Sequence, residues 1–185
     1  MTQTRAGTGQ TVRLDALRAE RARVLARRGQ AQAAVATRSY LVCACGADRF
    51  GLPLAQVAQV LPARPVTALP GAPPAVLGLI ALGGRVVSLL ALAPALGRGV
   101  DPAREDGQEA GHVVVVSGTA IPVAVAVGRV LGVAEIPEAA IDTAYAEAGL
   151  SAEAVSGYAP AGAGPGAESA FVIIDLPRLV RRYHA

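Results

Sequence analysis

Aromatic side chains are scarce in this chain of 185 residues: they make up 3% of the sequence, and tryptophan is absent. Because hydrophobic residues still account for 52%, the core must be built from Val, Leu, Ile and Ala. The 21 glycines and 13 prolines interrupt the chain too often for long helices. This composition favours many short strands.

Residues suited to metal binding or nucleophilic catalysis are also few. The chain has two cysteines, Cys43 and Cys45, and two histidines, His112 and His184. Neither histidine has a Cys, His or carboxylate at ligand spacing, and no Gly-x-Ser-x-Gly or phosphate-binding loop occurs. The cysteines are poorly placed for a disulfide, so we expect buried thiols. We expect no metal, no other cofactor and no enzymatic activity.

An unbroken apolar run that could cross a bilayer is missing too. The longest uncharged run, between Arg64 and Arg85, contains four prolines, whereas a spanning helix needs about 20 residues. The N-terminus is polar and arginine-rich, without the apolar stretch of a secretory signal. We therefore expect a cytoplasmic protein.

Positive charge is concentrated in residues 1–38, which hold eight arginines against Asp15 and Glu20. An apolar stripe predicts an amphipathic helix from Thr11 to about Arg28. This helix could pack on the domain or dimerise, contact an acidic partner or anionic lipid, or bind nucleic acid. No base-reading residues accompany the arginines, so sequence-specific nucleic-acid binding is not indicated.

The remaining chain has an internal duplication. Two apolar segments flank Gly83-Gly84, a pair suited to a tight hairpin turn. Residues 87–96 align with residues 170–179, where a strand again passes into a short helix that contains a proline, and Asp175 is expected to cap the helix from Leu176 to about Tyr183. A charged loop at residues 98–111 separates two halves of similar pattern.

Each half, 39–97 and 112–185, carries about five short strands in the same order. Five short strands cannot bury two faces as a flat sheet, so each half is expected to curl into a small barrel. Packing the two barrels together enlarges the core and leaves a seam, where we expect the binding surface. The predicted fold is mainly β, with an N-terminal helix and a short C-terminal helix.

The ordered series of strands, turns and glycines resembles the CheW-like domain of bacterial chemoreceptor arrays, from Tyr40 to about Leu179. The matching stretches are Leu41–Pro53, Val57–Val60, Val66–Pro70, Gly78–Gly84, Val130–Val133, Gly157 and Ile173–Leu176. The resemblance implies two SH3-like barrels and a non-enzymatic adaptor. Its implied partners are a CheA-type histidine kinase and the cytoplasmic tip of methyl-accepting chemoreceptors.

The resemblance also implies interaction residues. Those carried over to the receptor-facing groove are Val57, Gln59, Gly78 and Leu82. The family's central turn, Asn-Leu-Arg-Gly, is Ala81–Gly84 here, so Gly83 replaces an arginine associated with partner contacts. Arg85, two positions later, keeps the same face of a strand and could substitute for it.

Two alternatives remain open at this point. The chain could be a divergent CheW-like scaffold in another signalling pathway, because the turn arginine is missing. It could also be a nucleic-acid or anionic-surface binding protein that uses the arginine-rich helix.

Overall fold

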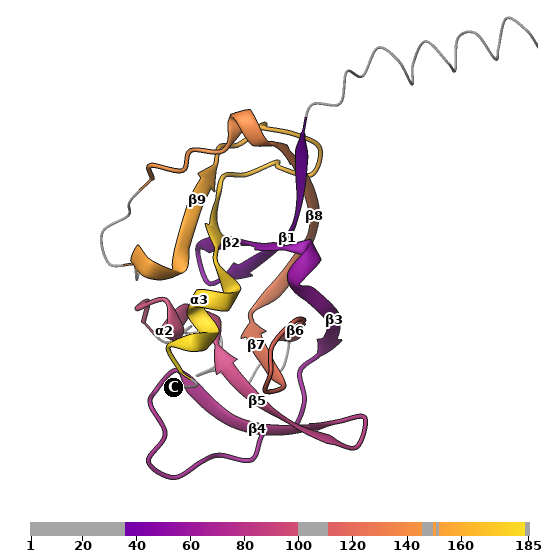
Figure 1. Cartoon of the computed structure of the whole chain (residues 1–185), viewed down its shortest axis with the longest axis vertical. Coiled ribbons are helices and arrows are strands. Elements are labelled where there is room, and N and C mark those ends of the chain that lie inside the picture. Colours follow the sequence, from indigo (N-terminus) through magenta and orange to yellow (C-terminus); the bar gives the residue numbers. More distant parts are fainter. Residues whose placement is uncertain (1–35, 100–110, 146–149, 151, 184–185) are drawn as a thin grey trace, which may run out of the picture. The chain divides into compact units, whose positions relative to one another are not determined.

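The computed structural model describes residues 36–99, 111–145, 150 and 152–183, which form two five-stranded sheets (Figure 1). The strand order of the first sheet is β8 (Arg129–Pro137), β1 (Thr37–Cys45), β2 (Asp48–Pro53), β10 (Phe171–Ile174) and β9 (Val155–Ala159). The order of the second is β3 (Val57–Pro62), β6 (His112–Val116), β7 (Val123–Val127), β5 (Arg85–Ala91) and β4 (Val76–Leu82). The described helices are short: α2 (Leu92–Ala95), α3 (Leu176–Arg181), and the 3-10 turns η1 (Leu54–Gln56), η3 (Glu138–Ala140) and η4 (Ala152–Ala154). The mainly β fold is as predicted.

Two predicted regions fall largely outside the described residues. The basic extension and its helix lie at residues 1–35, and most of the predicted loop lies at residues 100–110. At the boundary between extension and domain, β1 begins at Thr37, two residues before the predicted start.

Each sheet contains strands from both halves of the chain, which corrects the expectation that each half forms its own barrel. The β1–β2 hairpin of the first half lies between β8 and β10 of the second half. The β6–β7 hairpin of the second half lies in the same way between β3 and β5. If each strand is replaced by its counterpart in the other half (β1 by β6, β2 by β7, and so on to β5 by β10), the strand order of the first sheet becomes that of the second. The duplication is therefore present, with the two hairpins exchanged.

Parallel pairing explains why the halves interpenetrate. β10 pairs with β2 in parallel, and β5 pairs with β7 in parallel. A tight hairpin joins only antiparallel strands, so a parallel neighbour has to come from a distant part of the chain. Here it comes from the other half.

Both sheets are closed by the same device. In the second sheet, the chain that leaves β3 forms a bridge to β4, with Thr67 and Leu79 exchanging two backbone hydrogen bonds of 2.8 Å. In the first sheet, the chain that leaves β8 bridges to β9, with Asp142 and Tyr158 exchanging two bonds of 2.9 Å. In each sheet the segment that follows one edge strand, β3 or β8, is thereby hydrogen-bonded to the opposite edge strand, β4 or β9.

The strand pairing shifts the sequence alignment of the two repeats by one residue. Gly78 pairs with Leu89 and Gly157 pairs with Ile173, so Leu89 corresponds to Ile173 and not to Val172. The sequence alignment superposed the prolines after these strands. Those prolines occupy different places, the third residue of α2 and the second of α3, which is why the alignment was wrong by one position.

Two local predictions are confirmed. Gly83 and Gly84 join β4 to β5 with φ angles of 56° and 75°, the left-handed values that a two-residue hairpin turn requires. Asp175 caps α3, because its Oδ1 accepts a 3.0 Å hydrogen bond from the backbone N–H of Arg178.

Aliphatic residues dominate the buried core, as the composition predicted. A central cluster receives residues from both sheets and from α2 and α3, including Leu41, Cys43, Phe50, Leu90, Leu92, Val114, Val125, Ile174 and Leu176. A second cluster belongs to the first sheet and includes Tyr40, Val42, Ile136, Phe171 and Ile173. A third belongs to the second sheet: Ile80, Val87, Leu89, Val113 and Ala124. The central cluster joins the two sheets into one body.

We expect the folded protein to lose stability between pH 9 and pH 12 because of Cys43. Burial, with a smaller contribution from Cys45, raises the pKa of the Cys43 thiol from 9.0 to about 12. Above pH 9 the unfolded chain therefore loses this proton first, and the free energy of unfolding should fall by up to about 1.4 kcal/mol per pH unit. Urea unfolding across this range measures the slope. Cys43→Ala should flatten it, and an unchanged slope in that variant would contradict the assignment.

Candidate protein-interaction site

A groove of about 680 Å³ opens where the chain crosses from the first sheet to the second. Its lining residues come from the start of β1, the end of β2, η1, β9 and the end of β10: Thr37, Arg38, Ser39, Tyr40, Pro53, Leu54, Ala55, Gln56, Ser156, Ile173, Ile174 and Asp175. We call this cavity the crossover groove. Its size is within the usual range of binding sites, and its wall mixes apolar and polar groups.

The end of β2 creates the groove. The last pair between β1 and β2 is Tyr40 with Pro53, so β1 continues past its neighbour on that side. The chain then turns through η1, which the second sheet holds in place: Ser117 donates a backbone N–H to the Gln56 carbonyl at 2.8 Å and its hydroxyl to the Ala55 carbonyl at 3.2 Å. The groove thus has one wall on the first sheet and another on η1, which Ser117 holds in place.

The charged residues at the groove are already paired. Arg38 Nε lies 2.8 Å from Glu138 Oε1, and this hydrogen bond and charge raise the pKa of the Arg38 guanidinium above its ordinary value. Asp175 Oδ2 lies 3.2 Å from Arg178 Nε. Burial raises the pKa of the Tyr40 phenol, which remains neutral at physiological pH. The wall therefore presents little uncompensated charge to an occupant.

The six predicted interaction residues fall into two groups. Val57 follows η1 directly, is half-buried and packs against the central cluster, while Gln59 is exposed on β3 opposite Val115. Both lie beside the crossover groove in the sequence. The others are on the β4–β5 hairpin, at the other end of the strand order: Gly78 (buried), Leu82 (half-buried), Gly83 and Arg85 (both exposed).

The hairpin group adjoins two exposed apolar residues that the sequence did not single out. Val86 is 63% exposed and Ile121 is 51% exposed. The parallel pairing of β5 with β7 begins at Ser88 and Val123, so Val86 and Ile121 each lie two residues before the first pair. We call Leu82, Gly83, Arg85, Val86 and Ile121 the hairpin surface.

Comparison with known proteins identifies the fold. Residues 39–184 match the CheW-like domain. The chain belongs to the CheW-like domain family. Among solved structures, scaffolding protein TtCheW from Thermoanaerobacter tengcongensis matches with a TM-score of 0.65 and 20% sequence identity, over 76% of this chain and 86% of that chain. No curated protein matches the chain. CheW-like domains are non-enzymatic scaffolds of chemotaxis signalling.

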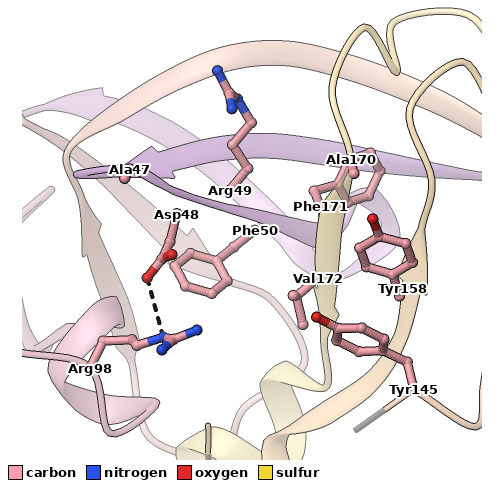
Figure 2. A pocket seen from close by; sticks show the side chains of 10 residues that line it. All are labelled: Ala47, Asp48, Arg49, Phe50, Arg98, Tyr145, Tyr158, Ala170, Phe171 and Val172. Atoms are coloured by element: carbon pink, nitrogen blue, oxygen red, sulfur yellow. Dashed lines mark ion pairs between the residues drawn. The ribbon is translucent and has the colours of Figure 1, made fainter. Parts of the chain in front are cut away.

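A second, smaller cavity lies at the start of β2 in this CheW-like domain. It measures about 140 Å³, and its ten lining residues, all labelled in Figure 2, include no Ser, Cys or His. Figure 2 shows Arg98 Nε facing Asp48 Oδ2 across 3.2 Å, and the rings of Tyr145 and Tyr158 stacked with centroids 4.5 Å apart. Within the described residues, no three His, Cys, Asp or Glu side chains converge as metal ligands, and no helix is long and apolar enough to cross a membrane.

None of the six residues predicted from the sequence lines the groove, and sequence reasoning did not single out Leu54 and Gln56, which do. The groove wall combines residues 37–40, 53–56, 156 and 173–175, and no local pattern connects segments so far apart. The one usable signal was Leu54 itself, an apolar residue that follows Pro53 at the end of a strand and remains exposed.

Proposed function

We propose that this CheW-like domain is a cytoplasmic adaptor that couples methyl-accepting chemoreceptors to a CheA-type histidine kinase. The receptor tip would dock at the crossover groove and the adjacent β3, with Leu54, Val57 and Gln59 in contact. The kinase would dock at the hairpin surface. The observation that carries this proposal is the open crossover groove, which strands of the first sheet and η1 form beside the start of β3 in a CheW-like fold.

The hairpin surface supports a second docking site. It keeps two strongly exposed apolar side chains next to the exposed Arg85. Exposed apolar side chains beside polar residues mark protein-interaction sites, and arginine is enriched at such interfaces. Arg85 would replace the guanidinium that the family has at the position of Gly83. Gly78 shapes this hairpin from inside the sheet, because its missing side chain lets β4 approach Thr67.

Leu54→Arg is expected to weaken binding to the receptor tip at least tenfold, because it replaces an apolar side chain of the groove wall with an unpaired charge. Val86→Arg should instead weaken binding to the kinase. Pull-down of each purified variant with the host's receptor tips and kinase measures both effects. Both side chains are exposed, so both variants should fold, and each is the control for the other. Full receptor binding by folded Leu54→Arg would show that the groove is not the receptor site.

A different role, binding to nucleic acid or an anionic surface through the arginine-rich residues 1–38, predicts a different salt dependence. Binding to phosphates weakens steeply between 50 and 200 mM salt, by about 10³-fold or more when six or more phosphates are neutralised. Docking of a receptor tip in the groove should change much less over that range. The same titration addresses a scaffold role in another pathway, which would bind neither partner at any salt concentration.

A further inference from the structure

Arg49 and Arg129 lie on one face of the first sheet, on either side of Ala44. The register pairs Ala44 of β1 with Arg49 of β2 and with Arg129 of β8. Directly opposite residues of antiparallel strands point to the same face, and neighbouring strands are about 4.8 Å apart, so the Cβ atoms of the two arginines are about 10 Å apart. We call Arg49, Ala44 and Arg129 the arginine row.

Neither arginine of the row has a carboxylate partner in the part of the chain that the structure describes. Both side chains are exposed to solvent, and no hydrogen bond or ion pair joins either of them to another described residue. Asp48, the acidic residue next to Arg49, is held by Arg98 across 3.2 Å, and Figure 2 shows the Arg49 side chain extending away from this pair. The row therefore presents two positive charges on one face, which repel each other and attract an anionic partner.

The number of charges decides between classes of anionic partner. Nucleic acids and anionic membranes bind to stripes or clusters of basic residues, typically four or more. The strands of the first sheet contain one further arginine, Arg38, and it is paired with Glu138. Two charges are too few for a polyanion. They suit a protein segment with two carboxylates, because the guanidinium fork binds a carboxylate through two parallel hydrogen bonds.

An exposed leucine beside the row favours a protein segment over a small anion. Leu131 follows Arg129 by two residues, at the point where the pairing of β8 with β1 shifts, and it is 42% exposed. Ion pairs that stay exposed contribute little, so a free carboxylate or phosphate ion would bind the row weakly. A partner that also covers Leu131 removes water from the arginines, which strengthens their attraction to its carboxylates. Exposed apolar residues beside arginines are typical of protein interfaces.

We propose that the arginine row and Leu131 form a docking surface for an acidic protein segment. One carboxylate of the segment binds each arginine, and an apolar side chain between them covers Ala44 and Leu131. This surface is distinct from the hairpin surface, which belongs to the second sheet, and from the crossover groove, whose β1 residues are at the opposite end of the strand. The inference goes beyond the proposed function and does not rest on it.

A helical peptide is a suitable probe, because helix residues seven apart share a face and are separated by about 10.5 Å along the axis, close to the spacing of the two arginines. The probe is an alanine-rich helical peptide of about 20 residues, a length at which such helices are stable. It carries two glutamates seven positions apart, with leucines at the third and fourth positions after the first glutamate. A second peptide has glutamine in place of both glutamates.

Arg49→Gln and Arg129→Gln should each weaken binding of the glutamate peptide to the full-length protein by about threefold to tenfold, and together by at least tenfold. Arg64→Gln makes the same change at an exposed arginine outside the first sheet and should leave the affinity unchanged. The arginines of residues 1–38 are present in every variant, so the differences between variants report on the row. NMR titration measures the affinity, and shifts in β1, β2 and β8 locate the bound peptide.

The glutamine peptide and inorganic phosphate complete the test. Both should bind the wild type at least tenfold more weakly than the glutamate peptide does, and Leu131→Asn should weaken binding of the glutamate peptide as well. If the folded double variant of Arg49 and Arg129 binds the glutamate peptide as tightly as the wild type, the inference is wrong. It is equally wrong if phosphate binds as tightly as the peptide, since the row would then be a simple anion site. Neither result affects the adaptor function, which the Leu54 and Val86 variants test.

Discussion

Gly78→Ala is expected to lower the free energy of unfolding by about 3 kcal/mol or more. Gly78 has a φ angle of 136°, which side-chain-bearing residues rarely adopt, and a Cβ atom there would overlap the backbone carbonyl of Thr67. Strain at such a φ costs about 1–3 kcal/mol and overpacking a similar amount. The carbonyl cannot move away easily, because it accepts the hydrogen bond of Leu79 that closes the second sheet. Urea unfolding measures the loss.

Gly71→Ala is the matched control. Gly71 has a φ angle of 75°, but a Cβ atom there would meet nothing within 4 Å. This variant should show the cost of a positive φ angle without steric overlap, about 1–2 kcal/mol. Gly157, the equivalent of Gly78 in the first sheet, lacks the unusual φ, and its Cβ would lie 3.0 Å from Ile141 and 3.1 Å from the Asp142 carbonyl. Gly157→Ala should therefore fall between the other two. If Gly78→Ala and Gly71→Ala lowered the free energy of unfolding equally, the Thr67 carbonyl would have to move away from the new Cβ atom at no energetic cost.

These values change how the interface is tested. From the sequence, a charged residue at Gly78 is an attractive way to block docking. In the structure the same change would disrupt the closure of the sheet, so a loss of binding could not be assigned to the interface. Leu54 and Val86 are exposed and are better positions for that experiment.

Local features of the fold were predictable because their causes are local. Gly83-Gly84 has the backbone freedom that a hairpin turn requires, and Asp175 has a side chain that can cap the next helix. The exposure of Val86 was not predictable. It shares a face of β5 with Leu90, which is buried in the central cluster, so alternation alone assigns both to the core. Val86 is exposed and Leu90 is buried because of where β5 begins and ends relative to the rest of the domain, and the sequence does not show this.

Long-range pairing was not predictable for a related reason. The apolar pattern of β1 and β2 fixes their hairpin and its buried faces, but a strand edge can accept any neighbour of suitable length. The sequence shows that the same order of strands occurs twice. It does not show which copy of β10 or β5 pairs with each hairpin. The crossover groove was hidden for the same reason, since the exchange of hairpins determines where β2 ends beside β10.

Cutting the chain between residues 104 and 105 should produce two fragments that fold only together. Four of the eight strand pairings, β1–β8, β2–β10, β3–β6 and β5–β7, join one half to the other. Each separate fragment keeps two hairpin-like pairs, and isolated two-stranded pairs are at best marginally stable in water. Circular dichroism and NMR of each fragment, and of an equimolar mixture, should show native β signal in the mixture alone.

Two separate barrels and two sheets with exchanged hairpins predict opposite results, so the experiment decides between these arrangements. If each half formed its own barrel, residues 1–104 and 105–185 would each unfold cooperatively, and the spectrum of the mixture would equal the sum of its parts. With exchanged hairpins, the mixture gains the parallel pairs of β2 with β10 and of β5 with β7, and with them the central cluster, in which Phe50 and Leu90 of one fragment pack with Ile174 and Val125 of the other. Because this core forms only on association, the unfolding midpoint of the mixture should rise with fragment concentration.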